Sequence, residues 1–423
     1  MSRSVHRRIM LILVGAIAVL ALAACGSSSS SSSSASSSAG GGGSSSSSAS
    51  SSASSSSGGG GQSYLSPGPT GGGIRPGTGS YAAKAVAAGQ VAAKDAGKPK
   101  KPLPTITVGV INFLNGIESS DRLADTATYA ASQLGWKTIV CDGKGTPTQF
   151  VACGDSLLNQ GVKAIIAVAV EPGQMQEVIS KAKSMNVPVI QTGGGAVPPG
   201  FSGNYGPNEQ EAGKLLSDAV IKKLDALPGN PSVVIHNFPS AWAAQRTLQF
   251  TNALKGQSKI KVAANVTTDA ANLVPFTRNA VSTEITQDPN AKAYWFTFDT
   301  TGQVGGGVLA AKYAGKSFPD RPLVVTFHAD LGTLQLMRQG KIDMTSEANY
   351  DAATWEAMNA IAELLTNGTT IPQANQPTFP VIGDPFTYQI VDKSNLPPAG
   401  QYVQPKWDVP SYFIAKWKAE FGK

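Results

Sequence analysis

Side chains of opposite charge follow predicted strands in the second half of the chain. Asp299 and Asp330 come directly after the apolar runs 291–298 and 323–328, and Arg246 lies on the helix predicted after an earlier strand. A guanidinium offers a fork of N–H donors, and an ionised carboxylate offers two acceptor oxygens. This combination suits a ligand rich in hydroxyl groups. The alternative for each residue is a salt bridge.

Other candidate residues also follow predicted strands. Phe113 and Trp242 come after the first strand of two successive series, where a flat ring can cover the apolar face of a sugar or simply pack against its own loop. Asn115, Glu171 and Thr192 follow strands of the first series. The alternative for these three is loop capping or exposure to solvent.

The elements that must position these side chains lie within residues 105–423. Near-continuous apolar strands alternate with amphipathic helices, which indicates parallel sheets covered on both faces. The turn-forming residues 228–231 separate two such series. We therefore predict an α/β fold with two doubly wound parallel-sheet lobes, with strands at 105–113, 137–141, 164–170, 187–191, 232–236, 260–267, 291–298, 323–328 and 342–346.

The N-terminus carries a basic segment with Arg3, Arg7 and Arg8, followed by an apolar run from Ile9 to Leu22 that is too short to span a bilayer comfortably. The run ends in Leu22-Ala23-Ala24-Cys25, which resembles the lipobox of a bacterial lipoprotein signal peptide. The resemblance implies removal of residues 1–24 and lipidation of Cys25, so that the chain is held on the outer side of a membrane. The alternatives are an ordinary secretory signal or a short anchor helix.

Residues 25–104 are rich in Ser, Gly, Ala and Pro, a composition that offers too little apolar surface to offset the chain entropy lost on folding. We expect this segment to be a disordered tether between the lipid anchor at Cys25 and the folded part. The alternative for its alanine-rich stretch 81–97 is a frayed helix.

The net charge of +7 is a poor guide to partners. Nine of the 34 basic residues but one of the 27 acidic residues precede residue 105, which leaves 25 basic and 26 acidic residues in the folded part. Because nucleic-acid binding needs a basic surface on the domain itself, no nucleic-acid partner is expected.

Cysteine and histidine usage limits the chemistry further. Cys141 and Cys153 form one possible disulfide in an oxidising compartment, the alternative being two buried thiols. His236 and His328 are the histidines left after His6 departs with the signal, so no metal site is expected. There is no phosphate-loop lysine motif, nucleophile elbow or dinucleotide fingerprint. We therefore expect neither an enzyme nor a bound cofactor.

The order of elements resembles the type I periplasmic binding proteins of ABC transporters, in their ribose-binding-like branch. The residues that carry the resemblance are Asp142, the segments 160–166 and 186–190, and Arg246, Asp299, Asp330 and Asn349. The resemblance implies two lobes, 105–228 with 350–378 and 229–349 with 379–423, that close over a ligand. It also implies a three-strand hinge, in which the chain crosses between the lobes near 226–231, 347–352 and 376–385.

The resemblance places Arg246, Asp299, Asp330 and Asn349 at ligand-facing positions. The first lobe departs from the family, because Gln191-Thr192-Gly193 stands where ribose-type members carry an Asp-Arg pair. A pentose is therefore not assumed as the ligand. The proline-rich segment 370–404 and a helix at 411–421 exceed what the family requires. We expect them to pack on the second lobe, with Trp407 buried, and the alternative is a contact with a partner.

These features and the resemblance imply a lipid-anchored, monomeric receptor that captures a small polar, sugar-like molecule and delivers it to an ABC permease. The alternatives are a sensor for a membrane kinase or chemoreceptor and, in another class, a surface carbohydrate-active enzyme.

Overall fold

A computed structural model describes residues 72–194, 200–372 and 381–423. Its first sheet has the strand order β2-β1-β3-β4-β5, and each neighbouring pair is parallel. The central strand β3 is buried along its whole length, as expected for a sheet covered on both faces. The strands are β1 (Thr107–Asn112), β2 (Lys137–Asp142), β3 (Ala164–Val168), β4 (Val189–Thr192) and β5 (Gly203–Tyr205).

The second sheet has the order β11-β10-β9-β8-β6-β7. It is parallel except for the edge strand β11, which runs antiparallel to β10. The predicted α/β architecture of two parallel-dominated sheets is thereby confirmed. The strands are β6 (Ser232–Asn237), β7 (Lys261–Thr267), β8 (Ala291–Phe296), β9 (Leu323–Phe327), β10 (Met344–Glu347) and β11 (Gln389–Asp392).

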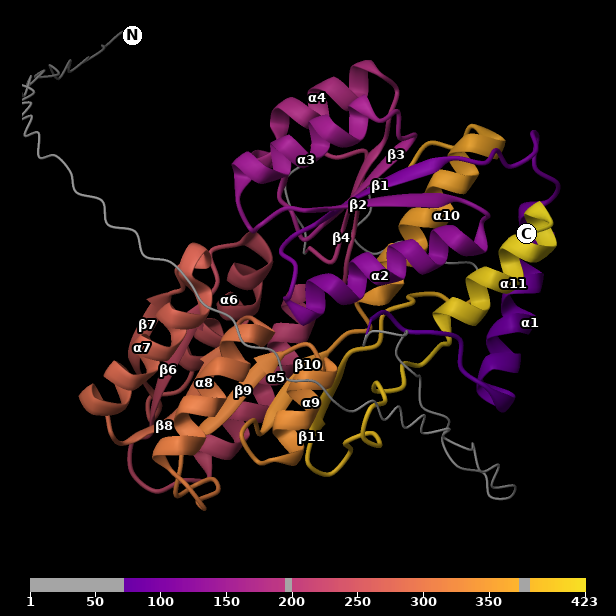
Figure 1. The fold of residues 1–423 in the computed structure, drawn as a ribbon. Helices are drawn as coiled ribbons and strands as arrows, with labels where there is room; N and C mark the ends of the chain where they lie inside the picture. Colours follow the sequence, from indigo (N-terminus) through magenta and orange to yellow (C-terminus); the bar gives the residue numbers. More distant parts are fainter. Residues whose placement is uncertain (1–71, 195–199, 373–380) are drawn as a thin grey trace, which may run out of the picture. The chain divides into compact units, whose positions relative to one another are not determined.

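Helices cover both faces of each sheet (Figure 1). In the first lobe, α2 and α10 pack on one face, and α3 and α4 pack on the other. In the second lobe, α5 and α6 lie opposite α7, α8 and α9. The bounds are α2 (Glu118–Gln133), α3 (Pro147–Asn159), α4 (Gln176–Ser184), α5 (Glu209–Asp225), α6 (Ala241–Lys255), α7 (Leu273–Gln287), α8 (Asp299–Lys312), α9 (Leu331–Arg338) and α10 (Asp351–Asn367), with short 3₁₀ turns at Pro172–Gln174 and Ala270–Asn272.

The expectation of a disordered tether over 25–104 is wrong for its last part. Residues Gly79–Ala96 form helix α1, and Ile74 just before it is buried. One side of α1 carries small residues that pack against α11 (Val409–Phe421). A Cβ atom added at Gly89 would lie 2.2 Å from the backbone oxygen of Tyr412, so only glycine allows this approach. Residues 25–71 of the expected tether, with Cys25, lie outside the described residues.

The expectation that the C-terminal helix braces the second lobe is also wrong. Tyr412, Phe413 and Trp417 of α11 belong to the same apolar cluster as Trp355 of α10, which is part of the first lobe. Strand β11, by contrast, joins the second sheet. The predicted segment 379–423 is therefore divided between the lobes. Trp407 is half-buried rather than buried, with the Lys84 ammonium 4.2 Å from its ring centroid.

Candidate functional site

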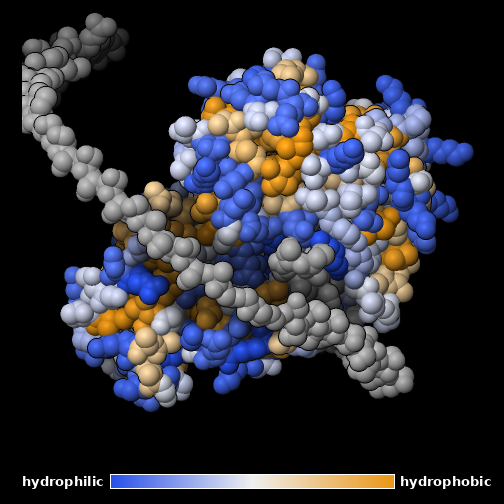
Figure 2. Space-filling model, in the orientation of Figure 1, coloured by the Kyte–Doolittle hydropathy of each residue, from blue (hydrophilic) through white to orange (hydrophobic). Residues whose placement is uncertain are grey.

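The carboxyl ends of both sheets meet at a cavity lined by residues of both lobes. Its walls combine aromatic rings with polar side chains, and Figure 2 shows hydrophilic residues in the hollow between the lobes. The cavity measures about 20 Å³, which is little more than the space that one water molecule needs. The lobes are therefore closed, and a larger guest requires them to open. The lining residues are Phe113, Ser119, Ser120, Leu123, Val168, Ala169, Gly193, Trp242, Arg246, Phe298 and His328.

Aromatic rings form one wall of this cavity. The Trp242 ring stacks on Phe238, with centroids 5.3 Å apart, and lies 5.5 Å from Phe298. Phe113 reaches from the first lobe to within 6.1 Å of the Phe238 ring centroid. The structure therefore brings the two predicted rings, Phe113 and Trp242, to one site.

Arg246 is fully buried and lines the cavity, but its donors are already engaged. Its guanidinium binds Glu209 in bidentate fashion at 2.6 and 2.8 Å and donates to the backbone oxygen of Thr297 at 2.7 Å and to the Tyr350 hydroxyl at 2.9 Å. Burial lowers the pKa of Arg246, but the charge and hydrogen bond of Glu209, together with Tyr350 and Asp299, outweigh this effect and the pKa is raised. The predicted donor is thus held in place by a buried ion pair whose partner, Glu209, sequence reasoning missed.

His328 also lines the cavity, and sequence reasoning did not select it. Its ring lies 3.9 Å from the Tyr350 ring, and its Nε2 accepts from Arg246 at 3.2 Å. Burial, together with the charges of Arg246 and Arg122, lowers the pKa of His328 well below its usual value. The imidazole is therefore neutral, which suits its role as an acceptor.

Asp299 and Asp330 are completely buried, yet neither lies on the cavity lining. Neither oxygen of Asp299 has a hydrogen-bond partner of good geometry. Burial raises the pKa of Asp299, and the nearby backbone N–H of Thr300 offsets part of this effect. Burial likewise raises the pKa of Asp330, against the lowering effect of Arg122. The two predicted acceptors therefore lie behind the cavity wall of the closed lobes.

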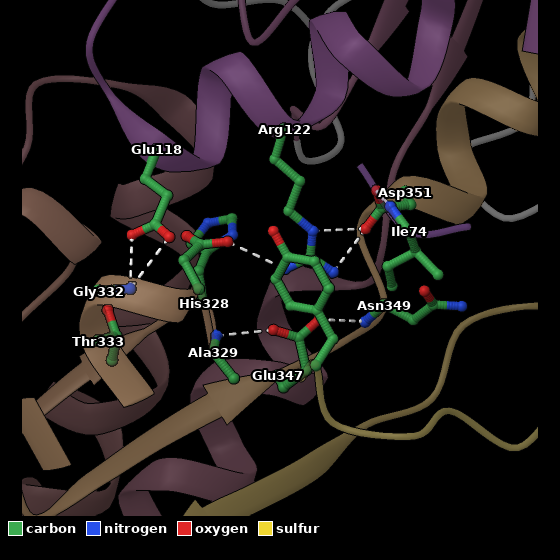
Figure 3. Close-up of polar contacts among 12 residues, drawn as sticks. Ile74, Glu118, Arg122, His328, Ala329, Gly332, Thr333, Glu347, Asn349 and Asp351 are labelled. Atoms are coloured by element: carbon green, nitrogen blue, oxygen red, sulfur yellow. Dashed lines mark hydrogen bonds and ion pairs between the residues drawn. The ribbon is translucent and has the colours of Figure 1, made fainter. Parts of the chain in front are cut away.

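Contacts from α2 tie the lobes together (Figure 3). Glu118 accepts the backbone N–H of Gly332 at 2.9 and 3.0 Å, at the first turn of α9. Arg122, one helical turn further on, binds Asp330 at 2.9 Å and Asp351 at 2.5 Å. The four-residue spacing of Glu118 and Arg122 is visible in the sequence, but no local pattern indicates partners more than 200 positions away. The two side chains hold the first lobe against the second.

The remaining predicted residues lie off the cavity lining. The Asn115 side chain accepts from Asn112 at 2.8 Å, and Glu171 accepts the backbone N–H of Ala241 in the other lobe at 2.5 Å. Thr192 is buried beside the lining residue Gly193. Asn349 donates to the Pro385 oxygen at 3.4 Å. The structure thus brings Phe113, Trp242 and Arg246 together and places these four residues around them.

Cys141 and Cys153 are joined by a disulfide, with Cα atoms 5.7 Å apart. The bridge ties the end of β2 to α3, beneath Phe113. Among the described residues, no group of three or more His, Cys, Asp or Glu side chains could hold a metal ion. Over the same ranges, no helix has the length and apolar character needed to cross a membrane.

Solved structures share this fold. A solute-binding protein of an ABC transporter from Mycobacterium smegmatis with bound glycerol is 18% identical and has a TM-score of 0.61, over 71% of this chain and all of that one. A Burkholderia graminis solute-binding protein in complex with D-arabinose is 19% identical and has a TM-score of 0.59, and the match covers 73% of this chain and all of that one. A periplasmic ribose ABC transporter protein from Conexibacter woesei is 17% identical and has a TM-score of 0.56, and the match covers 71% of this chain and 95% of that one.

A curated relative matches a shorter stretch. The xylitol-binding protein of Mycolicibacterium smegmatis is 33% identical over 85 residues, which is 20% of this chain. The matched stretch spans about a quarter (24%) of that relative's length. The family model described as a periplasmic binding protein domain matches residues 108–369, more than half of the chain and both sheets. The chain therefore belongs to the periplasmic binding protein family.

Proposed function

We propose that this protein is an extracytoplasmic solute receptor that closes its two lobes over a small sugar or polyol and delivers it to an ABC permease. The observation that carries the proposal is the cavity at the carboxyl ends of both sheets, lined by residues from each lobe. Family membership and the ligands of similar proteins, which include xylitol, glycerol and D-arabinose, support the ligand class.

The residues at the cavity suit such a guest. Rings like Trp242 and Phe113 can cover the apolar C–H face of a sugar, and Ser119 and Ser120 offer hydroxyl groups. When the lobes open, Asp299 and Asp330 become accessible from the cleft, and their buried oxygens can accept hydroxyl donors. Binding of a polyol would then satisfy polar atoms that lack partners in the closed form.

The test is a thermal-shift and calorimetric titration of the whole chain with xylitol, D-arabinose and glycerol. A ligand that binds the folded state raises the melting temperature by mass action. We expect Asp299→Ala and Trp242→Ala to lose this shift while still melting cooperatively, whereas the surface control Asp155→Asn keeps it. If no sugar or polyol shifts the wild type, or if Asp299→Ala retains the shift, the proposed binding site is wrong.

Anchoring and transport are tested in cells. Cys25→Ser is expected to abolish incorporation of labelled palmitate and to release the protein from the membrane fraction. Uptake of a labelled ligand should fall in the Asp299→Ala strain at equal protein level. Uptake that persists in that strain, with loss of a transcriptional or chemotactic response, would instead support the sensor alternative. Turnover of a glycan by the purified protein would support the enzyme alternative.

A further inference from the structure

A second cavity lies in the first lobe, away from the interlobe cleft. It measures about 110 Å³, several times the space that one water molecule needs. One face of α10 forms its floor, and the segment that follows α10 and the end of β5 complete its walls. Its lining residues are Tyr205, Glu356, Asn359, Ala360, Glu363, Thr369, Thr370 and Pro372.

Glu356 is the unusual member of this lining. Its side chain is 2% exposed, and neither carboxyl oxygen has a hydrogen-bond partner within residues 72–194, 200–372 and 381–423. A buried carboxylate without a partner is costly, so the group either keeps its proton or meets a donor from outside the protein. Burial, with Asp384 as a second cause, raises the pKa of Glu356 well above its usual value.

The lining offers acceptors and hydroxyls but no cation. It contains no Lys, Arg or His side chain. The nearest ammonium shown to contact a lining residue, that of Lys416, is already engaged by Asn359 at 3.1 Å, Glu363 at 2.8 Å and Glu420 at 2.5 Å. Glu363 is thereby neutralised, whereas Glu356 is not. A guest that pairs with Glu356 must therefore supply one positive charge and N–H donors.

We propose that this cavity is a second binding site, which takes a small primary ammonium ion against Glu356. The ammonium group donates to the Glu356 carboxylate, and the lining residues Tyr205, Thr369 and Thr370 carry hydroxyls that can accept its remaining protons. Glu363 is paired with Lys416, so Glu356 is the lining carboxylate without an ion pair, and one such carboxylate favours a monovalent ammonium over a divalent metal ion. Binding must ionise Glu356, so the site releases a proton as it fills.

The test is calorimetric titration of the whole chain with methylammonium chloride, with sodium chloride at matched ionic strength as the reference. Two buffers of different ionisation enthalpy at neutral pH measure the protons released. We expect saturable binding with release of close to one proton per protein. Glu356→Gln, which mimics the protonated side chain, should weaken binding by roughly ten- to a hundredfold, because a charge-assisted hydrogen bond is lost.

Glu177→Gln is the matched control, since Glu177 is an exposed carboxylate on α4, and it should bind like the wild type. Should Glu356→Gln fail to fold, Tyr205→Phe and the proton count of the wild type still test the proposal, with a smaller loss of affinity expected for Tyr205→Phe. The proposal is overturned if methylammonium gives no heat beyond sodium chloride, if it binds without releasing a proton, or if Glu356→Gln binds it equally well.

Discussion

Arg122 of the first lobe and Asp330 of the second lobe form a buried ion pair, with Nη1 and Oδ1 2.9 Å apart and side-chain exposures of 3% and 0%. The same guanidinium binds Asp351 at the start of α10 and lies 3.7 Å from Glu347. Since β10 leads into α10 through this segment, one arginine joins α2, the second lobe and a connection between the lobes (Figure 3). We infer that Arg122 stabilises the closed arrangement.

We therefore predict that Arg122→Leu destabilises the closed protein severely. Removing the cation leaves Asp330 and Asp351 buried without compensation, which costs about 3–5 kcal/mol. Arg75→Leu is the control, because the Arg75–Asp125 pair is partly exposed and should cost no more than about 1 kcal/mol. Urea denaturation at neutral pH measures both. Equal losses in the two variants would show that Arg122 has no special role.

The pH dependence of stability should report on His328. Its pKa in the folded state lies below the ordinary value of 6.5, because of burial and the charges of Arg246 and Arg122. The folded state therefore binds fewer protons than the unfolded state, so this group's contribution is present above pH 6.5 and is lost as the pH falls.

His328→Asn removes this titration and keeps a residue that tolerates the positive φ of 65° at this position. Between pH 6.5 and about pH 5, we expect the wild type to lose on the order of 1–2 kcal/mol relative to the variant. Both proteins share the same carboxyl groups, so the difference between their free energies of unfolding, measured by urea denaturation at each pH, reports the titration of His328 alone. A difference that stays constant with pH would contradict the assignment.

Strands β1–β4 and β6–β10 and most helices were predictable because each appears locally as an apolar run or as helical spacing. The short edge strands β5 and β11 were not predicted, because neither forms an apolar run. The positions of Asp299 and Asp330 after β8 and β9 followed from the same local pattern. The partners could not be predicted in this way. Arg122 meets Asp330 across 208 positions in the chain, and no local pattern indicates such a pair. Whether Arg246 would face a ligand or Glu209 likewise depends on tertiary packing.

Helix α1 was only the alternative to a disordered tether, for a different physical reason. Its buried face consists of Ala85, Ala88, Gly89, Ala92 and Ala93, which bury little area and resemble a tether in composition. The large apolar side chains that cover this face belong to α11, more than 300 residues later. The composition of residues 79–96 alone therefore does not reveal the apolar surface of α11 against which this helix packs.

The disulfide between Cys141 and Cys153 should contribute measurably to stability. Closing a loop of this length restricts the unfolded chain and stabilises the fold by about 3 kcal/mol in the chain-entropy treatment. We expect the double variant Cys141→Ser/Cys153→Ser to lose about this amount in urea denaturation. Reductant should destabilise the wild type similarly and leave the double variant unchanged. A wild type that is insensitive to reductant, with no free thiol exposed on unfolding, would contradict a contribution of this size.

Gly89 offers a test in which helix propensity and packing predict opposite signs. In an exposed helix, Gly→Ala stabilises by about 0.5–1 kcal/mol. At position 89, however, the new Cβ would lie 2.2 Å from the Tyr412 oxygen, which is backbone and cannot turn aside. We therefore expect Gly89→Ala to destabilise the docking of α1 on α11, whereas Ala87→Val at an exposed position of α1 changes stability by less than about 1 kcal/mol. Urea denaturation and the rate of proteolysis within α1 measure the two effects. If Gly89→Ala is instead more stable than the wild type, α1 does not pack as closely on α11 as the structure shows.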